Sequence, residues 1–235
     1  HAAVAFGFAF LIAPGGWFMR WVGWISGSSG PPPDWITIND PLGVSLVLGL
    51  ILKETPYLIL MTLALMPQVH AAESIRMATS LGFGVNQAWW RTVVPQLLPL
   101  LRLPVGAVLA YSISTVDMAL ILGPTTPPTL AVLLLRWLED PELTMRFHAA
   151  AAGVILLFLT MTVAAVFYGA EKLKFRFWKG WMLNGPSRSD GLLKFVPMVA
   201  WSLFTVSLLG LFTLGLWSFA YRWSWPMVLP IDWTL

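Results

Sequence analysis

Residues 147–168 read FHAAAAGVILLFLTMTVAAVFY, a run without a single Asp, Glu, Lys or Arg. A helix needs about 20 mainly apolar residues to cross the hydrocarbon core of a bilayer. Four further apolar stretches lie at about 2–14, 41–66, 103–122 and 195–219, the first of them short. The sequence therefore predicts an all-α, polytopic membrane protein with five transmembrane segments.

The composition agrees with this prediction. Of the 235 residues, 57% are hydrophobic and 11% are charged, whereas a soluble domain is about 25% charged. The net charge of +3 is modest, and no basic stripe suited to nucleic acid is present. Cysteine is absent, which excludes a disulfide framework and thiolate metal sites.

Charge placement predicts the orientation in the membrane. Lys and Arg concentrate after the fourth apolar segment, at Lys172, Lys174, Arg176, Lys179, Arg188 and Lys194. Cytoplasmic loops carry the excess of Lys and Arg, so this region is expected to be cytoplasmic. Alternation then places residues 67–102 on the cytoplasmic side as well. We expect a multi-pass protein of the inner (cytoplasmic) membrane.

Both ends of the chain resemble cuts, because it begins at His1 beside an apolar run and stops at Leu235 without a closing feature. A polar stretch rich in turn-forming residues, 185–194, separates the fourth and fifth apolar segments. We interpret it as a cytoplasmic linker between residues 1–184 and residues 195–235.

The sequence contains no convincing catalytic motif. Gly180 and Gly185 have the spacing of a phosphate-binding loop, but Pro186 occupies the place of its lysine. The histidines, His1, His70 and His148, are scattered. We expect no catalytic residues, no metal site and no cofactor bound by this chain, and hence a protein that is not an enzyme.

The stretch 67–102 is long for a loop between two membrane helices. It predicts a helix over 70–81, a break at 82–84, and a second helix over 87–94 that Asn86 caps and Pro95 ends. An ordered loop of this length indicates a docking surface. An amphipathic hairpin lying on the inner leaflet is the alternative interpretation.

This loop resembles the coupling loop of ABC-importer permeases, whose pattern is Glu-Ala-Ala, three residues, Gly, nine residues, Ile-x-Leu-Pro. Ala78, Gly82 and Pro95 match that pattern at the correct spacing. Arg76 stands where the family has glutamate, and Glu73 lies one helical turn earlier. The resemblance implies an ATPase-coupling loop that includes Glu73, Arg76, Ala78, Gly82, Gly84 and Pro95.

Two other stretches, 53–56 and 117–124, are similar to MetI-like permeases of the fused, two-copy kind, with a likeness to thiamine-type or ferric-iron-type importers. The resemblance implies that residues 1–184 are most of a first permease half and that 195–235 open a second. It also implies a cytoplasmic ABC ATPase dimer that carries the ATP, and an extracytoplasmic solute-binding protein.

Lys53 and Glu54 lie near the middle of the second apolar segment, where a charge costs about 2.5–3.5 kcal/mol. Successive helical residues point about 100° apart, so each is expected to find a separate partner. Pro56 favours a kink or a break. Together with Asp117, in the outer half of the third segment, they either line a translocation path or form structural polar pairs. An ion-coupled secondary transporter and a non-transporting scaffold are alternatives to the permease.

Overall fold

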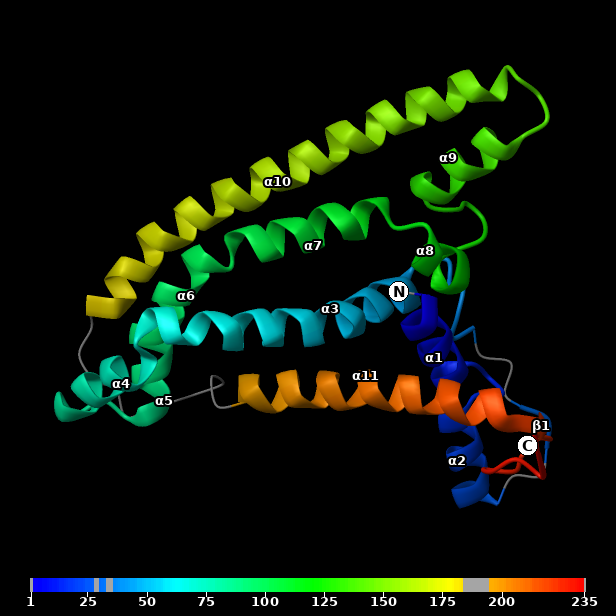
Figure 1. The fold of residues 1–235 in the computed structure, drawn as a ribbon, viewed down its shortest axis with the longest axis horizontal. Coiled ribbons are helices and arrows are strands. Elements are labelled where there is room, and N and C mark those ends of the chain that lie inside the picture. Colours follow the sequence, from blue (N-terminus) through cyan, green and yellow to red (C-terminus); the bar gives the residue numbers. More distant parts are fainter. Residues whose placement is uncertain (1, 28–29, 33–35, 184–194, 235) are drawn as a thin grey trace. The chain divides into compact units, whose positions relative to one another are not determined.

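A computed structural model describes residues 2–27, 30–32, 36–183 and 195–234, with the backbone alone described for 174–183 (Figure 1). The chain divides into two compact units. Unit 1 comprises residues 1–54, 115–153 and 203–235, and unit 2 comprises 55–114 and 154–202. Each unit is described by itself below.

Helices are the predominant secondary structure of the described residues. A short antiparallel pair of strands, β1 and β2, follows the last helix. The elements are α1 (Ala2–Ile12), α2 (Trp17–Ser26), α3 (Val44–Leu65), the 3-10 helix η1 (Met66–Val69), α4 (Ala71–Ser80), α5 (Val85–Ala88), the π-helix η2 (Trp89–Val93), α6 (Val94–Leu100), α7 (Arg102–Ser114), α8 (Asp117–Leu122), α9 (Leu130–Glu139), α10 (Met145–Leu183), α11 (Phe195–Phe219), β1 (Ala220–Arg222) and β2 (Asp232–Trp233).

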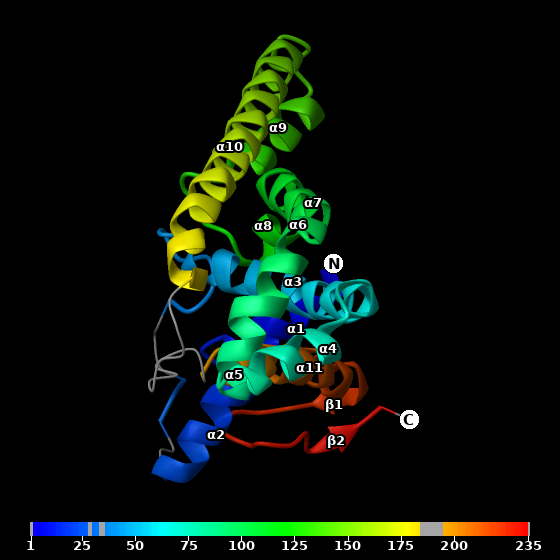
Figure 2. The ribbon, with the colours of Figure 1, turned by 90° about the vertical axis from the view of Figure 1, so that its left-hand side faces the viewer.

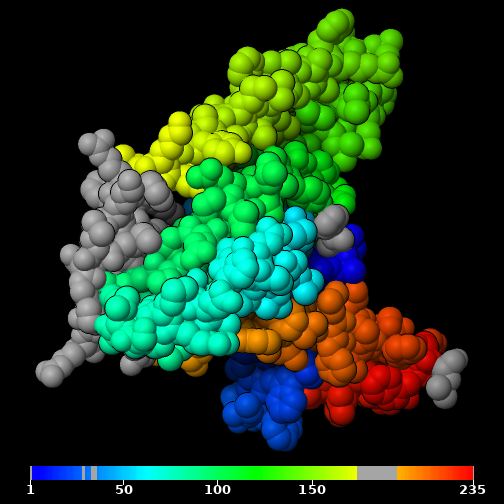
Figure 3. Space-filling view, turned by 60° about the vertical axis from the view of Figure 1, so that its left-hand side comes forward, coloured from blue at the N-terminus to red at the C-terminus, as the bar shows by residue number. Residues whose placement is uncertain are grey.

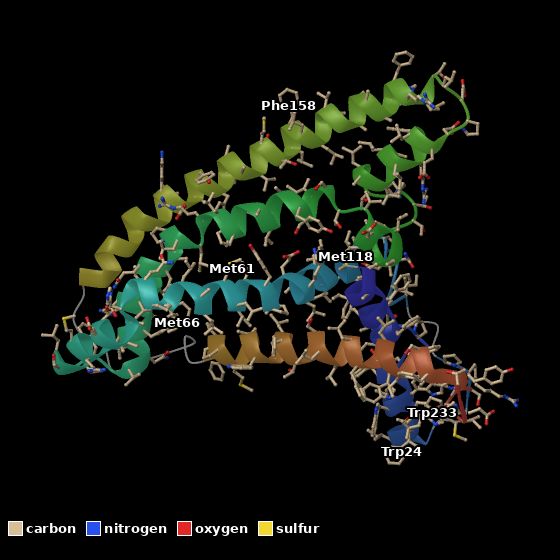
Figure 4. All side chains as sticks on the ribbon, in the orientation of Figure 1. Trp24, Met61, Met66, Met118, Phe158 and Trp233 are labelled. Atoms are coloured by element: carbon tan, nitrogen blue, oxygen red, sulfur yellow. The ribbon has the colours of Figure 1, made fainter. Side chains whose placement is uncertain are left out.

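Among the described residues, four helical stretches are long and apolar enough to cross a membrane: 2–26, 44–69, 145–173 and 195–219. A fifth is reached if the pair 85–100 and 102–114, bent by 60°, counts as one span. Their surfaces are apolar, as lipid contact requires. Phe158 on α10, for example, is 64% exposed and points away from its helix (Figure 4). The prediction of an all-α, polytopic membrane protein is confirmed.

The predicted span 103–122 is wrong as a single helix. Helix α7 ends at Ser114 and α8 begins at Asp117. Thr115 and Val116 are β-branched and fit a helix poorly, and the Ser114 hydroxyl donates back to the carbonyl of Ala110 at 3.1 Å. With 13 residues, α7 rises about 20 Å, less than the bilayer core of about 30 Å.

Helix α10 is longer than the predicted span 147–168. It runs for 39 residues to Leu183, a rise of about 58 Å. The basic positions from 172 to 179 therefore lie on a helix that continues beyond the bilayer thickness, and not in a loop. The predicted linker 185–194 lies outside the described residues, and the division into two permease halves stays a prediction.

The core of unit 1 depends on small residues where helices cross. Gly7 of α1 lies against Gly210 of α11 so closely that a Cβ on Gly7 would stand 2.3 Å from the Gly210 carbonyl oxygen. The buried Thr213 hydroxyl lies 3.1 Å from the Gly7 carbonyl oxygen. Close backbone approach at small residues is the usual way for helices to associate in lipid. The adjoining apolar core comprises Ala5, Phe8, Ala9, Leu52, Met118 and Leu122.

The start of α3 is joined to the end of α8. The Asp40 carboxylate accepts the backbone N–H groups of Val44 at 2.7 Å and Ser45 at 2.9 Å. The hydrogen bond with the Ser45 side chain is the main cause that lowers the pKa of Asp40 below its ordinary value. The Asn39 amide donates to the carbonyl of Gly123 at 2.8 Å.

A buried arginine joins α2 to the chain beyond α11. Arg20 is 4% exposed, and its guanidinium donates to the carbonyls of Gly15, Ser224 and Met227 at 2.9, 2.8 and 3.0 Å. It also lies 4.9 Å from the ring of Trp223. The sequence gives no sign of this burial, because Arg20 is a single basic residue among tryptophans.

We expect Arg20→Lys to lower the free energy of unfolding by about 1–3 kcal/mol, because an ammonium cannot reproduce the planar fork that reaches these carbonyls. Thermal unfolding in detergent measures the loss. Arg136→Lys, at an exposed position on α9, is the control. Equal melting temperatures for the two variants would contradict the structural role of Arg20.

Candidate coupling hairpin and membrane ion pair

Residues 71–100, the coupling hairpin, fold back on themselves next to the end of α3 in unit 2 (Figure 2). One arm is α4, and the other is the continuous run α5–η2–α6. The two arms enclose a small apolar core of Val69, Ala71, Val93 and Leu97, against which Leu65 and Met66 of the preceding span pack. The helix, break and helix predicted for this stretch are confirmed.

The turn between the arms requires glycine. Gly82 has a φ of +88°, in the left-handed region that costs other residues about 1–2 kcal/mol. The N–H of Phe83 donates to Ala78 at 3.2 Å, and the N–H of Gly82 donates to Thr79 at 3.0 Å. This pair of bonds is the Schellman motif that ends a helix and satisfies its last carbonyls.

The second arm differs from the prediction in two ways. It begins at Val85 with Gly84 at the N-cap position, so the predicted cap at Asn86 is wrong. Pro95 does not end the arm, because α6 continues to Leu100. Proline lacks an N–H and clashes with the carbonyl four residues earlier, and the π-turn at 89–93 gives the chain the extra width that a proline needs.

The tip of the coupling hairpin is apolar and exposed. Met77, Leu81 and Val85 are 62%, 72% and 67% exposed. Beside them lies an open groove of about 400 Å³. Its lining residues are Ser74, Met77, Ala78, Leu81, Phe83, Ala88, Arg91, Thr92 and Gln96. The surface of the hairpin can be followed in cyan and green in Figure 3.

The predicted coupling residues fall into two groups. Glu73, in the first turn of α4, and Arg76 have exposed side chains, whereas Ala78 is 5% exposed and lines the groove. Gly82 and Gly84 form the turn, and Pro95 lies in the first turn of α6. The structure thus brings all six onto one hairpin.

Sequence reasoning did not include Arg91 in the site. It is 7% exposed, and its guanidinium lies 5.3 Å from the ring of Phe83, which joins the second arm to the turn. The sequence position of Arg91 could have indicated its burial. It lies two turns after the glycines, on the same helix face as Gln87 and Val94, in a helix that is mainly apolar. A single basic residue in a segment between two membrane spans is otherwise expected to be solvated.

Lys53 and Glu54 form an ion pair within α3. The Nζ–Oε1 distance is 2.6 Å, and the side chains are 7% and 14% exposed. The prediction of separate partners is therefore wrong for these neighbours. Long side chains can bend toward each other although their Cα–Cβ bonds point about 100° apart. In surroundings of low dielectric constant, the electrostatic attraction between the two charges outweighs the conformational cost of this bending. Pro56 lies inside α3, which continues unbroken to Leu65.

Asp117 is separate from this pair. It is the first residue of α8 and its side chain is exposed. The structure therefore pairs two of the three predicted path residues and places the third on another helix. Whether they line a translocation path stays a prediction.

The spans and the ion pair among apolar helices define a polytopic α-helical membrane protein. The chain is similar to the inner membrane ABC transporter permease protein YnjC of Escherichia coli (strain K12), at 30% identity over 155 residues. The match covers 66% of this chain and 29% of that protein. It supports the resemblance to ABC transporter permeases and a location in the inner membrane. No protein-family model matches the chain, and no solved structure matches it.

Proposed function

We propose that the chain is part of the transmembrane permease of an ABC importer, and that its coupling hairpin docks on a separate cytoplasmic ATPase dimer. The observation that carries the proposal is the exposed apolar tip formed by Met77, Leu81 and Val85. A cytoplasmic segment that exposes such a tip on a turn fixed by glycine suits insertion into a protein cleft. Similarity to an ABC transporter permease indicates which protein provides that cleft.

The mechanism follows from a two-state permease. ATP on the partner dimer closes it, the hairpin moves with it, and the cavity between the spans changes the side on which it opens. The apolar core around Val93 and Leu97 joins the hairpin to Leu65 and Met66, so a displacement at the tip reaches α3 directly. Solute arrives from an extracytoplasmic binding protein, and this chain neither hydrolyses ATP nor holds a cofactor.

The exposed tip gives a test that leaves the fold intact. We expect Leu81→Glu with Val85→Glu to reduce retention of the ATPase at least tenfold, because two carboxylates would have to be desolvated in the cleft. The measurement is co-purification of the ATPase with the full-length protein from membranes. Ala72→Glu, exposed in the first turn of α4, introduces one carboxylate away from the tip and should retain the ATPase.

Equal retention of the ATPase by both variants would show that the coupling hairpin is not the docking surface. It would favour the alternative interpretation, an amphipathic hairpin lying on the inner leaflet.

The buried Lys53–Glu54 pair is the observation that favours a second candidate, an ion-coupled secondary transporter. Solute uptake into proteoliposomes separates the two candidates. Uptake driven by an ion gradient, without ATP or an ATPase, would establish the second.

A further inference from the structure

Helix α2 buries its charged residue and exposes apolar ones, the reverse of a helix on a water-exposed surface. Its charged residue, Arg20, is 4% exposed, whereas the exposed residues of α2 are apolar apart from Ser26 at its end, whose hydroxyl donates to the Gly23 carbonyl. A helix on a water-exposed surface presents its polar side chains and buries its apolar ones. The outward face of α2 is therefore built for an apolar environment. Its members, with their exposed fractions, are Phe18 (55%), Trp21 (41%), Val22 (44%), Trp24 (65%) and Ile25 (75%).

The contacts of α2 place it at the end of a membrane span. The ring of Trp17 lies 6.0 Å from that of Phe212, and the Arg20 guanidinium lies 5.9 Å from the ring of Trp217. Both partners are in the last turns of α11, a candidate span that ends at Phe219. With 10 residues, α2 rises about 15 Å, so within the candidate span 2–26 it covers only the part next to the end of α11. Tryptophans at this depth are typical of the headgroup region.

An apolar groove of about 590 Å³ lies between α2 and the segment that follows α11. This volume is within the range of about 300–1,000 Å³ that small-molecule pockets occupy. Its lining carries no charged side chain. The lining residues are Trp17, Trp21, Trp24, Met227, Val228, Leu229, Pro230 and Ile231. Trp24 is labelled at the end of α2 in Figure 4.

The walls of this groove are held in place by interactions inside unit 1. The indole N–H of Trp17 on one wall donates to the carbonyl of Val228 on the other, at 3.1 Å. Arg20 donates to the carbonyl of Met227 at 3.0 Å. Trp21 and Trp24 meet edge to face at 5.8 Å. These carbonyl groups accept bonds from the protein itself, so the groove offers a polar solute little to bind.

We propose that this groove holds an acyl chain of a membrane phospholipid, with α2 forming the interfacial end of the candidate span 2–26. Its uncharged lining, its depth at the end of α11 and the apolar exterior of α2 all suit hydrocarbon. The headgroup would then lie beside the tryptophans. This assignment is independent of the transport function, since it requires only that the chain is embedded in a bilayer.

These 235 residues contain no cysteine, so a cysteine introduced into them can be labelled selectively. Leu229→Cys on the groove wall and Leu208→Cys on the exposed face of α11 each carry one bimane label in detergent, in a full-length protein from which any cysteine outside these residues has been replaced. Brominated phosphatidylcholine is then added near equimolar amounts. We expect saturable quenching at position 229 and at least threefold weaker, unsaturable quenching at position 208.

A variant that fills the groove completes the test. Ile231→Trp, added to the labelled Leu229→Cys protein, should abolish the saturable quenching. Tyr221→Trp, which is 78% exposed and does not line the groove, should leave it unchanged. Equal quenching at positions 229 and 208 at every lipid ratio would show ordinary boundary lipid and overturn the proposal. A label at 229 that brominated lipid in vesicles never quenches would show that protein covers the groove, which also overturns it.

Discussion

Lys53→Met is expected to lower the free energy of unfolding by about 3–5 kcal/mol. The substitution leaves the Glu54 carboxylate, 14% exposed, without the ammonium that lies 2.6 Å from it. Glu54→Met should be about as harmful for the same reason. The double variant should be less destabilised than either single variant, because no uncompensated charge remains in the span. Unfolding in detergent with increasing denaturant measures all three.

The chain provides a matched control for this cycle. Arg102 and Glu171 form a second ion pair in unit 2, at the same distance of 2.6 Å, but the Arg102 side chain is 48% exposed. An exposed pair is worth only about 0–1 kcal/mol, so Arg102→Gln should change stability little. If Lys53→Met costs no more than Arg102→Gln, the membrane pair is solvated and the argument from burial fails.

The same double variant separates the two interpretations of the pair. A structural pair predicts that replacing Lys53 and Glu54 together preserves transport once the protein is inserted. A pair that lines the translocation path predicts that transport is lost although stability is recovered. Uptake into proteoliposomes, compared at equal amounts of folded protein, decides between them.

The structural features that the sequence predicts correctly are those whose physical cause lies within one segment of the chain. The apolar runs determine the spans, and the glycines determine the turn of the hairpin, because both effects act within one segment. The break between Ser114 and Asp117 was missed, since hydropathy does not register β-branched residues that strain a helix. The π-turn before Pro95 was missed because the usual rule treats proline as an end.

Contacts between distant segments were not predictable from the sequence. Arg20 and Met227 are joined by a hydrogen bond although they are separated by 207 positions. Nothing in the composition of either segment indicates the other. The Lys53–Glu54 pair was misjudged for a different reason. Ideal helix geometry describes where Cβ atoms point, whereas the reach of two long side chains and the low dielectric constant around them decide whether their charges meet.

Gly7 and Gly210 show how strictly a membrane helix crossing depends on one missing methyl group. We expect Gly7→Val to destabilise the protein by about 3 kcal/mol or more, because its Cβ would stand 2.3 Å from a backbone oxygen that has no flexible end to move. Gly210→Ala should cost far less, since its Cβ would meet the backbone of Phe8 at 3.4 Å. Gly215→Ala on the same helix, with no atom within 4 Å, should cost nothing.

This ordering tests the crossing and not merely the tolerance of α11 for larger residues. The thermal stability of the monodisperse protein in detergent should fall in the order Gly215→Ala, Gly210→Ala, Gly7→Val. Equal melting temperatures for the Gly7→Val and Gly215→Ala proteins would mean that α1 does not cross α11 at this point. The position of α1, and with it the Arg20 contacts that follow in the chain, would then have to be reassigned.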